Sequence, residues 1–265
     1  MDFADNIVEI AIDIAIEIVI EKNKILIMKL DILAFGAHPD DVELGCGGTI
    51  AKEISLGKKV GIIDLTRGEL GTRGSVEIRN KESEAAAKIL GVSVRENLDM
   101  RDGFFVNDEP HQLKIIKMLR KYQPEIVICN AIDDRHIDHG KGSRLVSDAC
   151  FLSGLMKIET EIDGIKQAAW RPKLVYHYLQ WKDLVPDFVV DISGFNEKRV
   201  EAILAYGSQF YNPNSSEPET LIASKNFLES LNYRAQDLGR LIGTDYAEGF
   251  TVERYLAVNS LSHLM

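Results

Sequence analysis

The sequence contains few cysteines, and their arrangement excludes two classes of protein. Among its 265 residues only Cys46, Cys129 and Cys150 are cysteines, an odd number with no Cys-x-x-Cys pair. This pattern rules out a disulfide framework and a cysteine-based metal knuckle. It favours a reducing, cytoplasmic setting.

Basic side chains are also scarce. There are 31 Lys and Arg against 41 Asp and Glu, which gives a net charge of −10 at pH 7. A chain with this balance lacks the broad basic face that nucleic acids and anionic membranes require, so we expect neither as a partner. An anionic ligand would have to meet individual arginines placed at its binding site.

The first 27 residues are apolar but lack the features of a membrane span or a signal peptide. Glu9, Asp13 and Glu17 interrupt the apolar stretch, and no basic segment precedes it. Isoleucine occupies every even position from Ile10 to Ile20, a period of two that favours a β-strand over a helix. We therefore expect residues 1–27 to be an extension that forms a strand of unknown role. Such an apolar strand needs a cover or a partner chain, and we expect a homo-oligomer.

From residue 29 onward, apolar runs alternate with helical patterns. Strands are predicted at residues 32–37, 60–65, 94–98, 125–130, 174–178 and 188–190, and helices at residues 42–55, 76–90, 109–122, 140–155, 197–206 and 217–241. A closing run occupies residues 249–258. Alternating strands and helices are typical of a mostly parallel sheet with helices on both faces. Because no long linker of Pro, Gly or Ser divides the chain, we expect residues 28–265 to form one Rossmann-like α/β domain with a C-terminal elaboration.

Ionisable side chains gather directly after the first predicted strand, in the segment 37–41, Ala-His-Pro-Asp-Asp. Ligands of open α/β sheets bind at the carboxyl ends of the strands. Neutral imidazole and carboxylate groups together make an ordinary ligand set for zinc. Taken alone, the aspartate pair has a simpler explanation, because an aspartate often caps the helix that follows it.

A second cluster, Asp-Asp-Arg-His-Ile-Asp-His at residues 133–139, follows another predicted strand, so both clusters point to the same edge of the sheet. Catalytic zinc takes three protein ligands and keeps a fourth position open. His38, one aspartate of the first cluster and one histidine of the second supply such a set. One aspartate then remains to take a proton from water, and one histidine to stabilise an oxyanion or protonate a leaving amine. The pattern predicts a metal-dependent hydrolase.

These segments resemble the LmbE-like, or PIG-L-type, zinc N-deacetylases. The resemblance rests on the residues 38–48, the loop 65–72 and the element His136-x-Asp138-His139, and it extends from about residue 29 to residue 259. Within that family the sequence most resembles the N-acetylglucosaminyl-malate deacetylases of bacillithiol biosynthesis. Ile137 stands where the family usually has proline, at a position that carries no reacting atom.

The resemblance implies roles for individual residues. It implies one Zn²⁺ per chain held by His38, Asp41 and His139, with Asp40 as general base, His136 as electrophilic or acid partner and Asp138 as the group that orients His136. Arg79 and Arg135 match arginines that face the substrate. The implied reaction hydrolyses the amide of an N-acetylglucosamine conjugate, with N-acetylglucosaminyl malate as the first candidate, and releases acetate and a free amine.

Several alternatives remain open from the sequence. Other substrates are free N-acetylglucosamine, chito-oligosaccharides, inositol-linked glucosamine and thiol conjugates. The alternative of another class is a non-catalytic Rossmann-like binding or assembly protein, although a purely structural metal site would need neither Asp40 nor His136. Arg79 also has a purely structural interpretation, in which it pairs with Glu82 or Glu84 on the surface of its helix. Arg67 and Arg73 are expected to be solvated in their loop.

Overall fold

The computed structural model describes residues 28–263, so the strand expected in residues 1–27 lies outside the described part. Its strands are β1 (Ile32–Gly36), β2 (Val60–Thr66), β3 (Val94–Met100), β4 (Ile126–Cys129), β5 (Glu161–Ile162), β6 (Ile165–Lys166), β7 (Leu174–Tyr178), β8 (Phe188–Asp191) and β9 (Ala247–Val252). Seven of them form one sheet in the order β3-β2-β1-β4-β7-β9-β8, and β5 pairs with β6. The five strands from β3 to β7 in this order are parallel, and β9 runs antiparallel to both of its neighbours.

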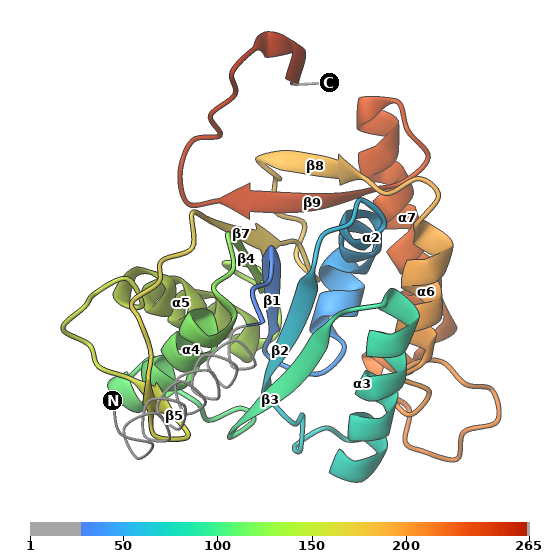
Figure 1. Cartoon of the computed structure of the whole chain (residues 1–265). Helices are drawn as coiled ribbons and strands as arrows, with labels where there is room; N and C mark the ends of the chain where they lie inside the picture. Colours follow the sequence, from blue (N-terminus) through green and yellow to red (C-terminus); the bar gives the residue numbers. More distant parts are fainter. Residues whose placement is uncertain (1–27, 264–265) are drawn as a thin grey trace, which may run out of the picture.

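Helices cover both faces of the sheet, as the sequence predicts. They are α2 (Asp41–Ser55), α3 (Val76–Leu90), α4 (Glu109–Tyr122), α5 (Ile137–Leu152), α6 (Asn196–Leu204) and α7 (Lys225–Ile242), with short 3₁₀ helices η1 (Leu221–Ala223) and η2 (Leu261–His263). In Figure 1, α4 and α5 lie on one side of β1, and α2, α3 and α6 lie on the other. The predicted fold class is confirmed. None of the helices in this described range is both long and apolar enough to cross a membrane.

The central strand β1 divides the core in two because alternate side chains of a strand point to opposite faces. Leu33 and Phe35 belong to the apolar cluster beneath α4 and α5. Ile32 and Ala34 belong to the cluster beneath α2, α3 and α6. All four side chains are buried. A strand buried on both faces is continuously apolar, which explains the run that made β1 recognisable in the sequence.

The strand order places a crevice at the carboxyl ends of β1 and β4. β1 pairs in parallel with β2 on one side and with β4 on the other. From β1 the chain therefore winds outward in two directions, and the point of reversal is where open α/β sheets bind ligands. The two ionisable clusters follow these two strands, so the topology brings them together.

Three features of the C-terminal half differ from the sequence prediction. The helix expected from residue 217 begins at Lys225, because Ser224 is extended and its side chain accepts a hydrogen bond from the N–H of Phe227, which caps the helix there. The closing run at residues 249–258 is a strand only as far as Val252, where β9 ends. The β5–β6 hairpin was not predicted; its strands have only two residues each, and its turn uses Asp163 and Gly164 at positive φ.

Gly45, in α2, provides a test of the packing behind the crevice. A Cβ at this position would lie 2.1 Å from Cδ2 of Tyr178, whose ring is buried and whose hydroxyl donates to the carbonyl of Phe35. We expect Gly45→Ala to lower the free energy of unfolding by about 1–3 kcal/mol, measured by equilibrium urea denaturation. The matched control is Gly140→Ala in α5, where a Cβ meets its nearest atom only at 3.4 Å. Equal urea midpoints for Gly45→Ala and the wild type would contradict this packing.

Candidate metal and catalytic site

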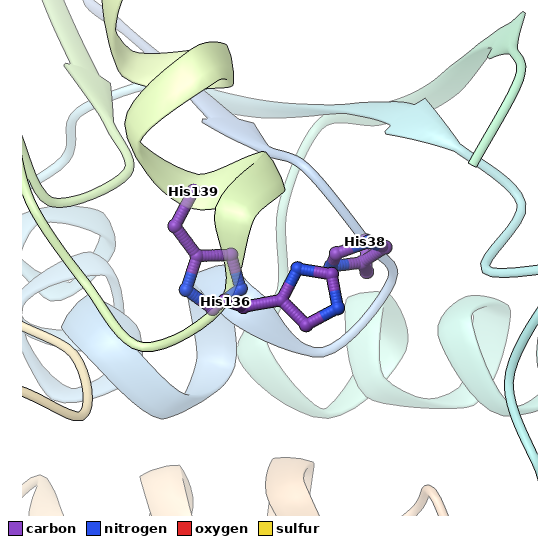
Figure 2. A group of neighbouring side chains, drawn as sticks. All are labelled: His38, His136 and His139. Atoms are coloured by element: carbon purple, nitrogen blue, oxygen red, sulfur yellow. The ribbon is translucent and has the colours of Figure 1, made fainter. Parts of the chain in front are cut away.

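The structure brings the two predicted clusters to one cavity of about 680 Å³. His38 and Asp40 lie between β1 and α2, Asp41 is the first residue of α2, and His136 and His139 lie at the start of α5. The ring centroids of His38 and His136 are 4.6 Å apart, those of His136 and His139 are 5.1 Å apart, and those of His38 and His139 are 5.7 Å apart. Figure 2 shows the three histidine side chains gathered together, His139 on the helix α5 and His38 on the loop that approaches it.

The loop after β1 has an unusual backbone that points its two aspartates to different partners. Asp40 has a φ of 111°, a left-handed conformation that is rare for a residue other than glycine. The N–H of His38 donates to Oδ2 of Asp41 at 2.9 Å, which closes the loop on itself. Although Asp40 occupies the N-cap position of α2, its side chain makes no capping hydrogen bond. Helix capping therefore does not account for this aspartate pair.

Asp41 lies between two histidines. Its Oδ1 is 3.1 Å from Nε2 of His139, and its Oδ2 is 3.5 Å from Nδ1 of His38. The amide groups of Asn130 and Gln180 each donate to one of its oxygens at 3.0 Å. Burial works to raise the pKa of Asp41, but the neighbouring His139 and His38 outweigh it and hold that pKa well below its usual range. The side chain is therefore an oriented carboxylate.

The remaining nitrogen of each flanking histidine faces a carboxylate. Nε2 of His38 is 3.0 Å from Oδ1 of Asp102, and Nδ1 of His139 is 2.6 Å from Oδ2 of Asp134. Such outer partners fix the orientation of imidazoles that bind metals. Asp102 was not predicted from the sequence. It nevertheless lies just after β3, and an ionisable side chain at the carboxyl end of a strand was the signal that identified the other two clusters.

The residues fit a divalent cation such as zinc. Two groups in the described part of the chain bring potential ligand atoms within 4.8 Å of one another: His38, His136 and His139, and His38, Asp102 and Asp138. Burial opposes a charge on His139, but Asp41 and Asp134 outweigh it and raise its pKa to about 9. The surrounding carboxylates thus favour positive charge at the centre of the site, and imidazole with carboxylate is a donor set that suits zinc.

Asp40, the predicted base, contacts Arg79. Nη2 of Arg79 is 2.9 Å from Oδ2 of Asp40 and also donates to the carbonyl of Pro39. Burial raises the pKa of Asp40 to about 7, against the opposing charge of Arg79. The alternative pairing of Arg79 with Glu82 is wrong, because Glu82 accepts instead from the backbone and hydroxyl of Ser208.

Asp138 has different contacts from those expected. Its carboxylate accepts from the N–H of Gly103 at 2.7 Å and from Lys141 at 3.1 Å, and it lies 3.5 Å from Nε2 of His38. His136 is held instead by the backbone N–H of Asp138, which is 3.3 Å from its Nδ1. Burial, together with the charges of His38 and His139, lowers the pKa of His136. The neutral imidazole is therefore favoured.

The arginines near the cavity differ in their exposure and in the groups that they contact. Arg135 is exposed, and its guanidinium lies 4.9 Å from the centre of the Trp181 ring. Arg67 is exposed and pairs with Asp99. Arg73, expected to be solvated, is buried and donates to the carbonyl of Ser208 and the hydroxyl of Ser215. The segment around residues 208–218 folds over it, which the sequence pattern did not reveal.

The fold and the site together define a class: a Rossmann-like α/β protein with a cluster of histidines and aspartates at the switch point of its sheet. Residues 33–150 match the family model PIG-L, described as GlcNAc-PI de-N-acetylase. This matched segment contains both ionisable clusters. The chain belongs to the PIG-L family of deacetylases.

Three similar proteins extend this comparison. The conserved protein TT1542 from Thermus thermophilus has a solved structure that superposes with a TM-score of 0.77 at 36% identity, over 87% of this chain and 98% of that one. Diacetylchitobiose deacetylase from Thermococcus kodakarensis is 28% identical over 88% of each chain. The uncharacterized deacetylase YaiS from Escherichia coli is 40% identical over 41% of this chain, a match that spans 61% of YaiS.

Proposed function

We propose that this protein is a zinc-dependent N-deacetylase that removes the acetyl group from an N-acetylglucosamine conjugate. The observation that carries the proposal is the pair of adjacent aspartates with separate environments. Asp41 lies between His38 and His139, whereas Asp40 is buried beside Arg79 in the same cavity. One carboxylate is thus placed to bind a cation and the other to move a proton. The similarity to a diacetylchitobiose deacetylase supports an amino-sugar substrate.

His38, Asp41 and His139 would hold the zinc ion. When bound, zinc polarises the amide carbonyl and makes a water molecule more acidic. Asp40 accepts the proton of the attacking water, and its pKa of about 7 suits proton transfer near neutral pH. As the C–N bond breaks, the protonated Asp40 passes this proton to the leaving nitrogen, and the products are acetate and a free amine.

His136 is placed to stabilise the oxygen of the attacked carbonyl. Because its Nδ1 accepts the N–H of Asp138, the proton of the neutral ring is on Nε2. His136 lines the cavity, so this N–H is a hydrogen-bond donor for the negative charge that develops during attack. The role needs no charge on His136, which agrees with the direction of its pKa shift.

We propose N-acetylglucosaminyl malate as the first conjugate to test, since Arg135 at the cavity can bind a carboxylate. A cavity of about 680 Å³ is large enough for a sugar together with its aglycone. Zinc-loaded protein is incubated with this conjugate and with free N-acetylglucosamine, and the free amine is measured. A rate on the malate conjugate that exceeds the rate on the free sugar supports the proposal. Absence of amine release from both, and from a methyl glycoside of N-acetylglucosamine, would overturn it.

Arg79 provides a test of whether an arginine binds substrate or positions the base. The sequence resemblance places it at the substrate, but in the structure it contacts Asp40. We expect Arg79→Gln to lower kcat by about tenfold or more and to leave KM within about twofold, because only the base loses its partner. Steady-state kinetics on the best substrate measure both constants. A raised KM with an unchanged kcat would restore the substrate-binding role.

A further inference from the structure

Arginines are concentrated at the cavity although the chain carries a net charge of −10. Five of them line it: Arg73, Arg79, Arg135, Arg199 and Arg234. Two of them lie beside a carboxylate, and a third is covered by a loop. Arg79 pairs with Asp40, Arg199 lies 3.7 Å from Glu248 and donates to the carbonyl of Leu231, and Arg73 binds the 208–218 segment.

Arg135 and Arg234 form no ion pair with any residue that the structure describes. Both contact Trp181: Arg135 lies over its ring, and Arg234 donates to its carbonyl oxygen at 2.6 Å. Arg234 is half-buried, and this burial lowers the pKa of its guanidinium. The charges of Asp183 and Asp134 oppose this shift, but neither aspartate forms an ion pair with Arg234, so an anionic ligand that contacts the guanidinium directly would offset more of the cost of its burial.

These two arginines lie close to the proposed catalytic residues. Trp181 directly follows Gln180, whose amide donates to Asp41. Arg234 comes from α7, and Phe227, near the start of the same helix, stacks on Trp181 with ring centroids 5.6 Å apart. The wall beside the catalytic centre thus combines two guanidinium groups with an aromatic surface.

We infer that Arg234 and Arg135, which both contact Trp181, form a subsite for a carboxylate carried by the aglycone of the substrate. This inference rests on the proposed function and names the chemistry of the group attached to the sugar. A guanidinium offers two parallel N–H donors that match a carboxylate. Arg234 lies outside residues 33–150, the segment that the family model matches, whereas Arg135 lies within it. Arg234 is therefore a specificity-determining residue and takes no part in the chemical step.

The test compares two substrates of the same skeleton, N-acetylglucosaminyl malate and its dimethyl ester. The variants are Arg234→Gln, Arg135→Gln and, as matched control on the exposed part of α7, Arg240→Gln, which removes a surface pair with Asp237. We expect Arg234→Gln and Arg135→Gln each to lower kcat/KM for the acid by about 10- to 100-fold and for the ester by less than about threefold. Arg240→Gln changes both by less than about twofold.

A binding measurement separates failure of the subsite from failure of the proposed function. Glucosaminyl malate, which contains no acetyl group, is titrated into each protein by isothermal calorimetry. If the wild type hydrolyses neither substrate yet binds glucosaminyl malate, with at least about tenfold weaker binding in Arg234→Gln, the subsite stands and the proposed reaction fails. If Arg234→Gln affects acid and ester equally, or affects neither, the subsite is overturned while the deacetylase proposal is untouched.

Discussion

Asp40→Asn is expected to lower kcat by about 10²- to 10⁴-fold, the range that general base catalysis contributes. Asparagine has nearly the same size and shape as aspartate but cannot accept the proton of the attacking water. The substitution also leaves Arg79 facing a neutral amide in place of a carboxylate at 2.9 Å. Release of free amine from the best substrate measures the loss, with the zinc content of each preparation determined in parallel.

The matched control for this prediction is Asp133→Asn. Asp133 belongs to the second cluster, is exposed and pairs with Lys182 at the surface. We expect it to keep kcat within about twofold, as is usual for exposed ion pairs. If Asp40→Asn retains the wild-type rate with its zinc in place, the proton acceptor is another group. If Asp40→Asn loses zinc together with activity, Asp40 contributes to metal binding. The proposal that Asp41 binds the metal while Asp40 moves the proton is then wrong.

The fold was predictable because its signals are local. Strands such as β1 and β2 are continuous apolar runs, since a parallel sheet covered by helices buries both faces of its strands. Helix α3 ends at Gly91, whose φ of 85° supplies the left-handed residue that commonly terminates a helix. The start of α7 was not predictable in the same way, because residues 217–224 contain apolar side chains at helical spacing but adopt an extended segment and a 3₁₀ turn.

The candidate site was only partly predictable from the sequence. His38, Asp41, His136 and His139 are close in sequence within two motifs, and the carboxyl ends of β1 and β4 bring those motifs together. The groups that orient them come from distant strands and loops. Asp102 follows β3 and Gln180 follows β7. The end of a strand was the one sequence signal at these positions, and the three-dimensional structure shows that they contact His38 and Asp41. The same limit applies to Arg79, whose partner Asp40 is 39 residues away.

Asp41→Asn is expected to weaken zinc binding by more than about 100-fold. Loss of an outer partner of a metal ligand typically costs about 10- to 100-fold in affinity, and the loss of a ligand costs more. Asp41 is the carboxylate between His38 and His139, and its two oxygens face one nitrogen of each. Affinity is measured by competition with a chromophoric chelator, and the activity of the wild type should disappear with excess chelator and return when zinc is added.

Comparison of Asp41→Asn with Asp102→Asn decides which group of residues holds the ion. Asp102 contacts Nε2 of His38 at 3.0 Å, and His38, Asp102 and Asp138, unlike the proposed set His38, Asp41 and His139, form a group whose ligand atoms all lie within 4.8 Å of one another. If Asp102 is an outer partner, Asp102→Asn weakens zinc binding by about 10- to 100-fold, less than Asp41→Asn. The reverse order would place the ion against Asp102 and Asp138. Asp41 would then lose its role as ligand, and the proposal that one of the two adjacent aspartates binds the ion while the other moves the proton would be wrong.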